Sequence, residues 1–152
     1  MQAGYIPRDE ATNVDWALLI VRLCAGIVFV AHGAQKMFGA FGGPGLDAIV
    51  QMLGPVGYLV SVGEFFGGLG LIFGVLSRFS AASLIVIMLG AIAKVHWQNG
   101  FFLGAKMGFE YNFALIGMLA AVLIAGPGLF AIGRFLPLPK KRNSNRILPA
   151  LQ

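Results

Sequence analysis

The chain has 152 residues, of which 58% are hydrophobic and only 11% are charged, whereas a soluble domain carries about 25% charged residues. This composition excludes an ordinary soluble domain and indicates an integral membrane protein. The net charge of +5 comes largely from a C-terminal basic run, which is typical of a tail on anionic lipid rather than of a nucleic-acid site: Arg134, Lys140, Lys141, Arg142 and Arg146.

Four apolar runs follow one another along the chain, at residues 16–38, 56–76, 79–97 and 113–135. At about 1.5 Å per residue, each is expected to cover a hydrocarbon core of about 30 Å. The sequence therefore predicts an all-α fold, an integral membrane four-helix bundle over residues 16–136. It lies between an N-terminal segment (1–15) and a basic tail (137–152). The only cysteine, Cys24, excludes an internal disulfide and a thiolate metal cluster.

The basic residues predict the orientation of the bundle. An even number of spans puts both termini on one side of the membrane. That side collects Arg8, Arg78 and the basic tail, whereas Lys36 and Lys106 lie on the other side. The positive-inside rule then places both termini in the cytoplasm, as in a multi-pass protein of the cytoplasmic (inner) membrane.

Three connections join the predicted spans. The first begins with a Gly-Gly-Pro-Gly turn at 42–45 and continues with residues 46–53, whose apolar side chains recur at helical spacing. That spacing predicts a short amphipathic helix in the outer membrane interface, closed by the following Gly-Pro pair. The second connection, 77–78, is so short that it predicts antiparallel neighbours. The third, 98–112, is rich in glycine and aromatic residues, which fits an aromatic belt or a lid over the outer mouth.

Small residues are spaced four apart within the second and fourth spans, a pattern that lets helix backbones approach closely. The positions are Gly63, Gly67, Gly70, Gly74, Gly117, Ala121 and Ala125. Further along, the Gly-Pro-Gly sequence at 126–128 is expected to kink or end the fourth helix.

A single acid, Glu64, lies in the middle of the second apolar run. A carboxylate at that depth costs at least a few kcal/mol unless it is paired or neutralised, so it marks a candidate functional site. At 100° per residue, Arg22, His32 and Lys36 share one face of the first span, and Lys94 lies on the small-residue face of the third. We expect Glu64 to be ionised and held by Lys94 from the outer side and by Arg22 from the inner side.

These cations outnumber the acid that they face. Lys36, Lys94 and Arg22 surround one interior carboxylate, with His32 and Gln35 beside them. Surplus positive charge in a pocket of low dielectric favours an anionic ligand, or an oxyanion that develops on a bound carbonyl. Two alternatives stay open: Glu110 in the outer loop supplies the missing negative charge, or the ion pair only fixes the helix register.

Two histidines, His32 and His96, lie at the outer ends of their spans, where a pair at one level can ligate a haem. However, His96 is 200° from Lys94 and lies on the opposite face if the helix persists to Trp97. That geometry disfavours a haem and favours interfacial hydrogen bonding or substrate contact for His96.

An ordered series of motifs resembles the DoxX family of small four-span membrane proteins, from about Trp16 to Phe130. The motifs are RLCAGIVFVAHGAQKMFGAFGGPGL, GEFFGGLGLIFGVLSRFSA, VHWQNGFF, GFEYNFALIG and GPG. The resemblance implies a bacterial or archaeal cytoplasmic-membrane protein linked to redox metabolism, with relatives named as subunits of thiosulfate:quinone oxidoreductase or as oxidoreductases. The family's motif positions fall on Arg22, His32, Gly33, Lys36, Glu64, Gly67, Gly68, His96, Gly100, Glu110 and Tyr111.

The leading hypothesis is a membrane-embedded subunit of a quinone-linked oxidoreductase, which binds a quinone head group or a small anionic reductant in the outer half of the bundle. His32, Glu64 and Lys94 are the predicted catalytic residues: His32 exchanges protons, Lys94 stabilises the reduced oxyanion together with Lys36, and Glu64 holds the lysine or relays protons. The other predicted substrate-binding residues are Arg22, Gln35, His96, Glu110 and Tyr111.

No flavin or nicotinamide motif is present, so electrons are expected from a soluble or membrane redox partner, or from the substrate itself. We expect no metal and no covalently bound cofactor, and the small-residue faces leave a homo-oligomer open. The rival hypothesis is a non-enzymatic lipid or small-molecule binding protein, a carrier, or an assembly partner of a redox complex. Under a third, purely structural hypothesis, the charges only pin the helices together.

Overall fold

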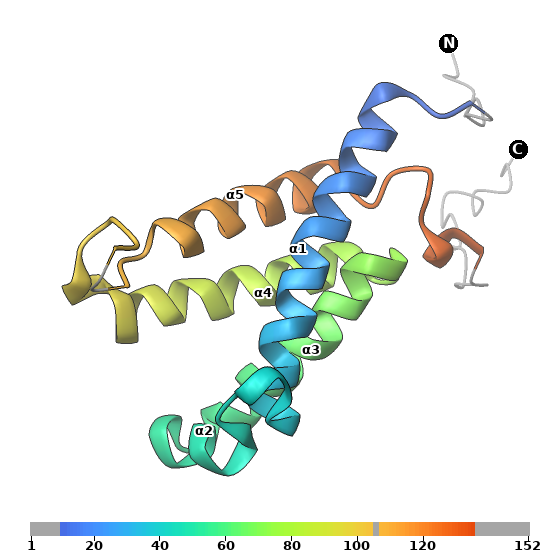
Figure 1. Ribbon diagram of the computed structural model, residues 1–152. Coiled ribbons are helices and arrows are strands. Elements are labelled where there is room, and N and C mark those ends of the chain that lie inside the picture. The colour runs from blue at the N-terminus through green and yellow to red at the C-terminus, as the bar shows by residue number, and fades with distance from the viewer. Residues whose placement is uncertain (1–9, 105–106, 136–152) are drawn as a thin grey trace, which may run out of the picture.

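The structure is a computed structural model that describes residues 10–104 and 107–135, and it is helical with no strand within those ranges (Figure 1). The α-helices are α1 (Asn13–Phe38), α2 (Gly45–Leu53), α3 (Val56–Phe73), α4 (Ser77–Ala91) and α5 (Glu110–Ala125). Short turns of π- or 3-10 helix occupy Ala40–Gly42, Ile92–His96, Trp97–Asn99 and Ile132–Phe135. The basic residues Arg8, Lys106 and those of the tail after Arg134, used to predict the orientation, lie outside the described ranges.

Three helical stretches are long and apolar enough to cross a membrane: Asn13–Phe38, Val56–Phe73 and Ser77–Asn99. The fourth apolar helix, α5, has only 16 residues. The apolar run at 113–135 does not form one continuous helix, because Gly126 ends α5 with a φ of 87°. This confirms the expectation that the Gly-Pro-Gly sequence would interrupt the helix there.

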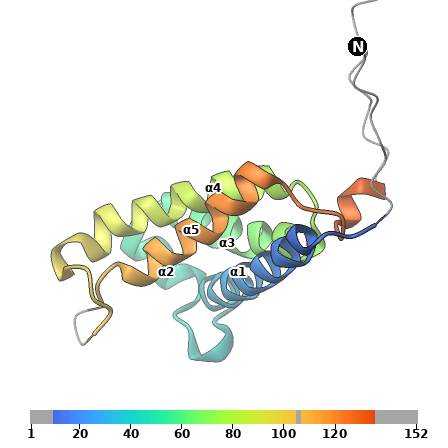
Figure 2. The same cartoon turned by 90° about the horizontal axis from the view of Figure 1, so that it is seen from above.

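The helices form two pairs, one of α1 with α3 and one of α4 with α5. Viewed from above, α3 and α5 lie between α1 and α4 (Figure 2). The pairs meet where α3 packs against α4 and where α1 crosses α5, and Figure 1 shows the α4–α5 pair running obliquely away from the other pair beyond that crossing. The buried core draws on all four helices: Ala25, Phe29, Leu71, Ala81, Leu84, Met88, Leu115, Leu119 and Val122.

Glycines bring the backbones of α1 and α3 into contact. A Cβ added to Gly33 would lie 2.4 Å from the backbone nitrogen of Phe65, and one added to Gly68 would lie 2.7 Å from that of Val30. This contact fixes the register of the two helices, as close packing of small residues does in membrane bundles. The predicted stripe on α5 does not behave in this way, since nothing lies within 4 Å of a Cβ added to Gly117.

The start of α1 holds the segment that follows α5. Asp15 caps α1 together with Thr12 and also accepts a hydrogen bond of 2.8 Å from the backbone N–H of Leu129. Arg22 is completely buried and donates to the carbonyl oxygens of Pro127 and Phe130. The prediction that Arg22 anchors Glu64 is therefore wrong, because its guanidinium is committed to this backbone segment.

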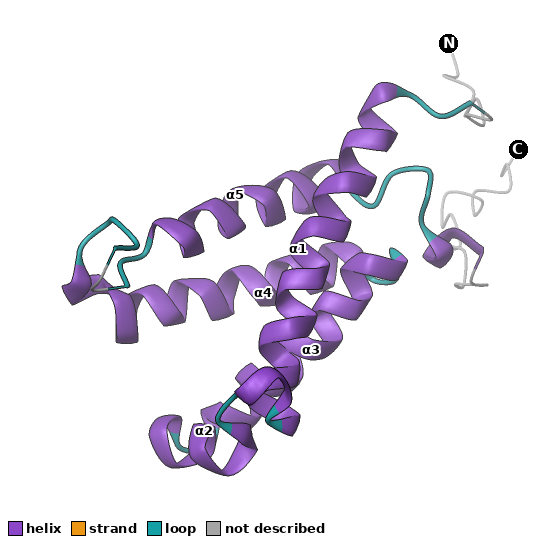
Figure 3. Cartoon of the chain, viewed as in Figure 1, coloured by secondary structure: helices purple, strands orange, loops and turns teal. Residues whose placement is uncertain are grey.

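The first connection contains the helix that the sequence predicts, here α2, which packs against α3 through the buried Ile49 (Figure 3). A 3-10 turn at Ala40–Gly42 leads into it, and Gly54 ends it with a φ of 65°. Its position in the membrane interface stays a prediction. The helix also contributes side chains to the groove described next.

Candidate functional site

A large groove, with a volume of about 1330 Å³, runs along α3 and α4. Side chains from α1, α2, α5 and the loop before α5 complete it. Of the residues that the sequence singles out for chemistry, the groove gathers His32, Lys36, Glu64, Lys94, His96 and Tyr111. The remaining predicted site residues, Arg22, Gln35 and Glu110, are not among those that line it.

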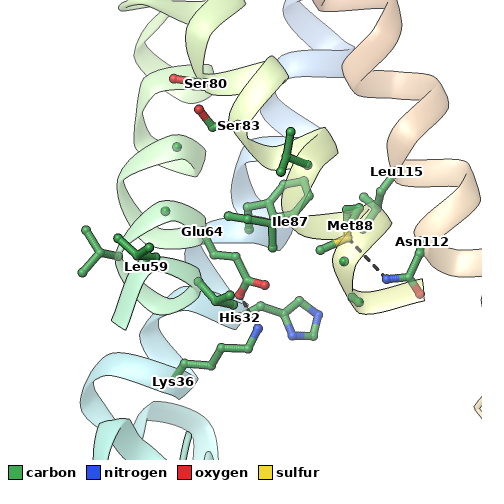
Figure 4. Close-up of a pocket in the computed structure, with 18 of the residues that line it drawn as sticks. His32, Lys36, Leu59, Glu64, Ser80, Ser83, Ile87, Met88, Asn112 and Leu115 are labelled. Atoms are coloured by element: carbon green, nitrogen blue, oxygen red, sulfur yellow. Dashed lines mark hydrogen bonds and ion pairs between the residues drawn. The ribbon is translucent and has the colours of Figure 1, made fainter. Parts of the chain in front are cut away.

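An ion pair between Lys36 and Glu64 lies in this groove. Figure 4 shows the ammonium of Lys36 directed at the Glu64 carboxylate, which it contacts. The Glu64 side chain is only 3% exposed, whereas that of Lys36 is 23% exposed. Glu64 is therefore paired, as predicted, but with a different partner: Lys36 takes the place expected for Lys94.

The geometry of the helices explains this change of partner. Because α1 and α3 touch at Gly33 and Phe65, Lys36 lies one turn beyond the contact, within reach of Glu64. The α4–α5 pair runs away from α3 toward its outer end, and Lys94 is exposed there. Lys94 thus stays a cation of the groove wall.

His32 lies beside the ion pair in Figure 4 and is exposed to the groove. Its ring centroid is 6.3 Å from that of Tyr111, at an interplanar angle of 58°. This contact links α1 to the first turn of α5 across the groove. His32 and Tyr111, which are 79 positions apart in the sequence, therefore face the same space.

His96 lies on the loop side of the groove. The α-helix ends at Ala91 and continues as a π-helical turn over Ile92–His96, so the condition for placing His96 opposite Lys94 is not met, and both residues line the groove. Nδ1 of His96 is 2.8 Å from the carbonyl oxygen of Met107. A carbonyl oxygen can only accept, so Nδ1 carries the proton and Nε2 is the nitrogen left for a ligand.

The loop that carries Met107 is closed by backbone hydrogen bonds. The N–H groups of Phe109 and Glu110 donate to the carbonyl oxygens of Gly100 and Phe101, at 3.1 and 2.8 Å. The rings of Trp97 and Phe109 stack, with centroids 5.8 Å apart. Since Leu103, Met107 and Gly108 line the groove, the loop forms part of its wall, and its role as a lid over the outer mouth stays a prediction. Its place in an aromatic belt stays a prediction.

Sequence reasoning missed several polar residues of the groove. Asn112 is 7% exposed and its side-chain N–H donates to Met88 Sδ at 3.4 Å. The predicted fourth helix began after Asn112, although the acidic Glu110 is a usual first-turn residue and could have marked the true start. Ser80 and Ser83 also line the groove, within a run that was treated as apolar.

The charges of the groove do not balance. Glu64 is its one carboxylate among the described residues, and it pairs with Lys36, while Lys94 is a second lysine of the groove wall. The imidazoles of His32 and His96 add hydrogen-bonding groups to these lysines. Within the described ranges no three His, Cys, Asp or Glu side chains gather in a way that could hold a metal ion. The groove therefore offers hydrogen-bond donors and positive charge at one end of a long apolar surface.

Comparisons with known proteins relate the chain to one family. The family model described as DoxX matches residues 17–97, which include His32, Lys36, Glu64, Lys94 and His96. A Bacillus subtilis (strain 168) protein named "Putative oxidoreductase CatD" is 25% identical over 133 residues, covering 84% of this chain and 91% of its own. The "Inner membrane protein YqjF" of Escherichia coli (strain K12) is 29% identical over 126 residues, covering 80% and 93%. No solved structure matches the chain.

Proposed function

Because the chain belongs to the DoxX family of membrane proteins, we propose that it is the membrane-embedded subunit of a quinone-linked oxidoreductase. In this proposal its four apolar helices span the inner membrane with both termini in the cytoplasm. A quinone head group, or a small anionic reductant, binds at the polar end of the groove. The observation that carries the proposal is the Lys36–Glu64 pair, set with further cationic groups in an otherwise apolar groove.

The chemistry of the polar end supports this assignment. Reduction of a quinone to a hydroquinone adds two electrons and two protons, and negative charge develops on the oxygens. Lys36 and Lys94 donate hydrogen bonds to those oxygens and stabilise the charge. His32 exchanges the protons with the head group, and Glu64 holds Lys36 in position. The electrons come from a redox partner protein or from the reductant itself.

The names of the relatives agree with parts of this proposal. The Bacillus subtilis protein is named an oxidoreductase, and the Escherichia coli protein is named an inner membrane protein. Each name applies to the relative that carries it. The comparison with this chain rests on the match of the family model over α1 to α4. The catalytic step itself is carried by the groove residues.

Quinone binding and quinone-dependent turnover in lipid nanodiscs test the proposal. Lys94→Met is the informative variant, because Lys94 is exposed and the fold does not depend on it. We expect it to weaken binding about tenfold, or by about 1.4 kcal/mol. Gln98→Ala, an exposed polar change at the same end but outside the groove, is the control. Unchanged binding and turnover in both Lys94→Met and Glu64→Gln would refute the proposal.

The second candidate function is a non-enzymatic carrier or binder of a lipid-like molecule, which includes an assembly partner of a redox complex. The apolar extent of the groove along α3 and α4 favours it. Under this alternative the purified protein binds lipid or quinone but transfers no electrons to it. A redox-dependent absorbance change of bound quinone separates the two functions.

A further inference from the structure

The ion pair of the groove lies well apart from its two serines. Figure 4 places Lys36, His32 and Glu64 together, and Ser80 and Ser83 at the opposite end of the view. Between these ends the wall consists of apolar side chains and glycines of α3 and α4, such as Gly67, Leu69, Phe73 and Ile87. From Glu64 to Phe73 the groove follows nine residues of α3, about 14 Å at 1.5 Å per residue.

The apolar part of the groove opens sideways, away from both ends of the helices. Its flanks include Phe66, Phe73, Phe79 and Val86, which are 57%, 49%, 70% and 69% exposed. All four belong to stretches that are long and apolar enough to cross a membrane, so in the proposed arrangement these side chains face lipid rather than water. A ligand in this part of the groove enters from the bilayer.

We propose that this seam between α3 and α4 binds the long apolar tail of an isoprenoid-type quinone, whose ring lies beside Lys36 and Glu64. The inference rests on the proposed function and decides between the two ligands that it leaves open. A small water-soluble anion would contact the lysines but would leave about 14 Å of apolar groove unoccupied. Burial of a tail along the seam adds binding free energy in proportion to the apolar area covered.

The depth of the ion pair in the membrane favours an uncharged quinone ring over a charged phospholipid head group. Glu64 lies eight residues into α3, about 12 Å from the start of that helix. A phospholipid head group carries a permanent charge and belongs at the interface, so drawing it to this depth is costly. An oxidised quinone ring is uncharged and accepts hydrogen bonds through two carbonyl oxygens, which suits Lys36, Lys94 and His32.

The test compares two quinones with the same ring, one with a ten-carbon tail and one with a methyl group in its place, in the same nanodiscs. Ser83→Phe blocks the seam at the end remote from the ion pair, as Figure 4 places Ser83. Ala121→Phe adds the same ring to an exposed position of α5 outside the groove and is the matched control. A given quinone partitions to the same extent into discs that carry the variant and discs that carry the parent chain. The ratio of the two affinities therefore reports binding to the protein alone.

We expect Ser83→Phe to weaken binding of the tailed quinone about tenfold and to leave the tail-less one unchanged, with Ala121→Phe affecting neither. Equal affinities of Ser83→Phe and the parent chain for the tailed quinone would overturn the tail site while leaving the head-group site intact. Weaker binding of both quinones to Lys94→Met, together with selectively weaker binding of the tailed quinone to Ser83→Phe, supports both proposals. A tailed quinone carrying a photoreactive group at its end gives an independent readout: labelling at Phe73, Phe79 or Ser83 supports the seam, and labelling confined to α5 overturns it.

Discussion

Lys36 in the last turns of α1 contacts Glu64 in α3, and the two side chains are unequally buried. The acid is 3% exposed and the ammonium-bearing side chain is 23% exposed. Loss of the partner should therefore cost more free energy for Glu64, which is shielded from solvent, than for Lys36. This asymmetry is the basis of the first prediction.

Lys36→Met should lower the free energy of unfolding by about 3–5 kcal/mol, because it leaves a buried carboxylate without its partner. Glu64→Gln should cost less, since Lys36 can extend its ammonium toward a more polar region. The double variant should be more stable than Lys36→Met alone. Unfolding in mixed detergent micelles, followed by circular dichroism, measures all three.

The control for this cycle is Lys94→Met, which removes an exposed ammonium from the same groove and should change stability by no more than about 0.5 kcal/mol. Equal losses in the two single variants of the pair, or strictly additive losses in the double variant, would contradict the assignment of Lys36 as the partner of Glu64.

The glycines offer a second prediction with a matched control. Gly33→Ala should cost about 1–3 kcal/mol, because its Cβ would lie 2.4 Å from the Phe65 backbone. Gly117→Ala should be neutral or stabilising by up to about 1 kcal/mol, since nothing lies within 4 Å and alanine favours a helix. Thermal unfolding of the two variants decides the matter. A tolerated Gly33→Ala would mean that α1 and α3 are not in backbone contact.

Arg22 gives a third prediction. Arg22→Met should lower stability by about 2 kcal/mol, because it leaves the part-buried carbonyls of Pro127 and Phe130 without their donor. Amide hydrogen exchange of residues 126–131 should become faster. Glu64→Gln should leave that exchange unchanged, and Arg22→Met should leave the polar end of the groove intact. A loss of groove binding without faster exchange would restore the interpretation that Arg22 acts on Glu64.

The turn after α1 provides a fourth prediction. Phe41 is 81% exposed and has a φ of 53°, in the left-handed region that costs an L-residue about 1–2 kcal/mol. Phe41→Gly should therefore stabilise the protein by about 0.5–1 kcal/mol. Gly42→Ala, next along the chain at a φ of 72° with open space around it, should destabilise by about 1 kcal/mol. Opposite signs for the two changes in the same unfolding assay are the expected result.

Hydropathy predicted helix ends well where a single helix corresponds to a single apolar run. The first predicted span ends at Phe38 and the second begins at Val56, as α1 and α3 do. The short helix between them was found from its 3.6-residue spacing, and α2 ends at the predicted Leu53. These features depend on local sequence alone, which is why periodicity and turn residues identify them.

The partner of Glu64 was beyond this reasoning. Facing directions at 100° per residue placed Glu64 and the cations on interior faces, but the choice among them depends on where helices touch and where they diverge. Contact at Gly33 brings Lys36 to Glu64, and the oblique course of α4 takes Lys94 away. The π-helical turn over Ile92–His96 also changes the spacing on which the arithmetic relies.

The shortness of α5 bears on the membrane around it. Its 16 residues extend about 24 Å, less than a hydrocarbon thickness of about 30 Å, while the 26 residues of α1 extend about 39 Å. In the four-span arrangement that we propose, residues 126–131 lie at the end of this short span, where acyl chains offer their backbone no donors or acceptors. Arg22 and Asp15 form hydrogen bonds with the backbone of this stretch that water would form elsewhere. In that arrangement we expect the bilayer to be thinner beside α5 than beside α1, because the shorter helix leaves a hydrophobic mismatch.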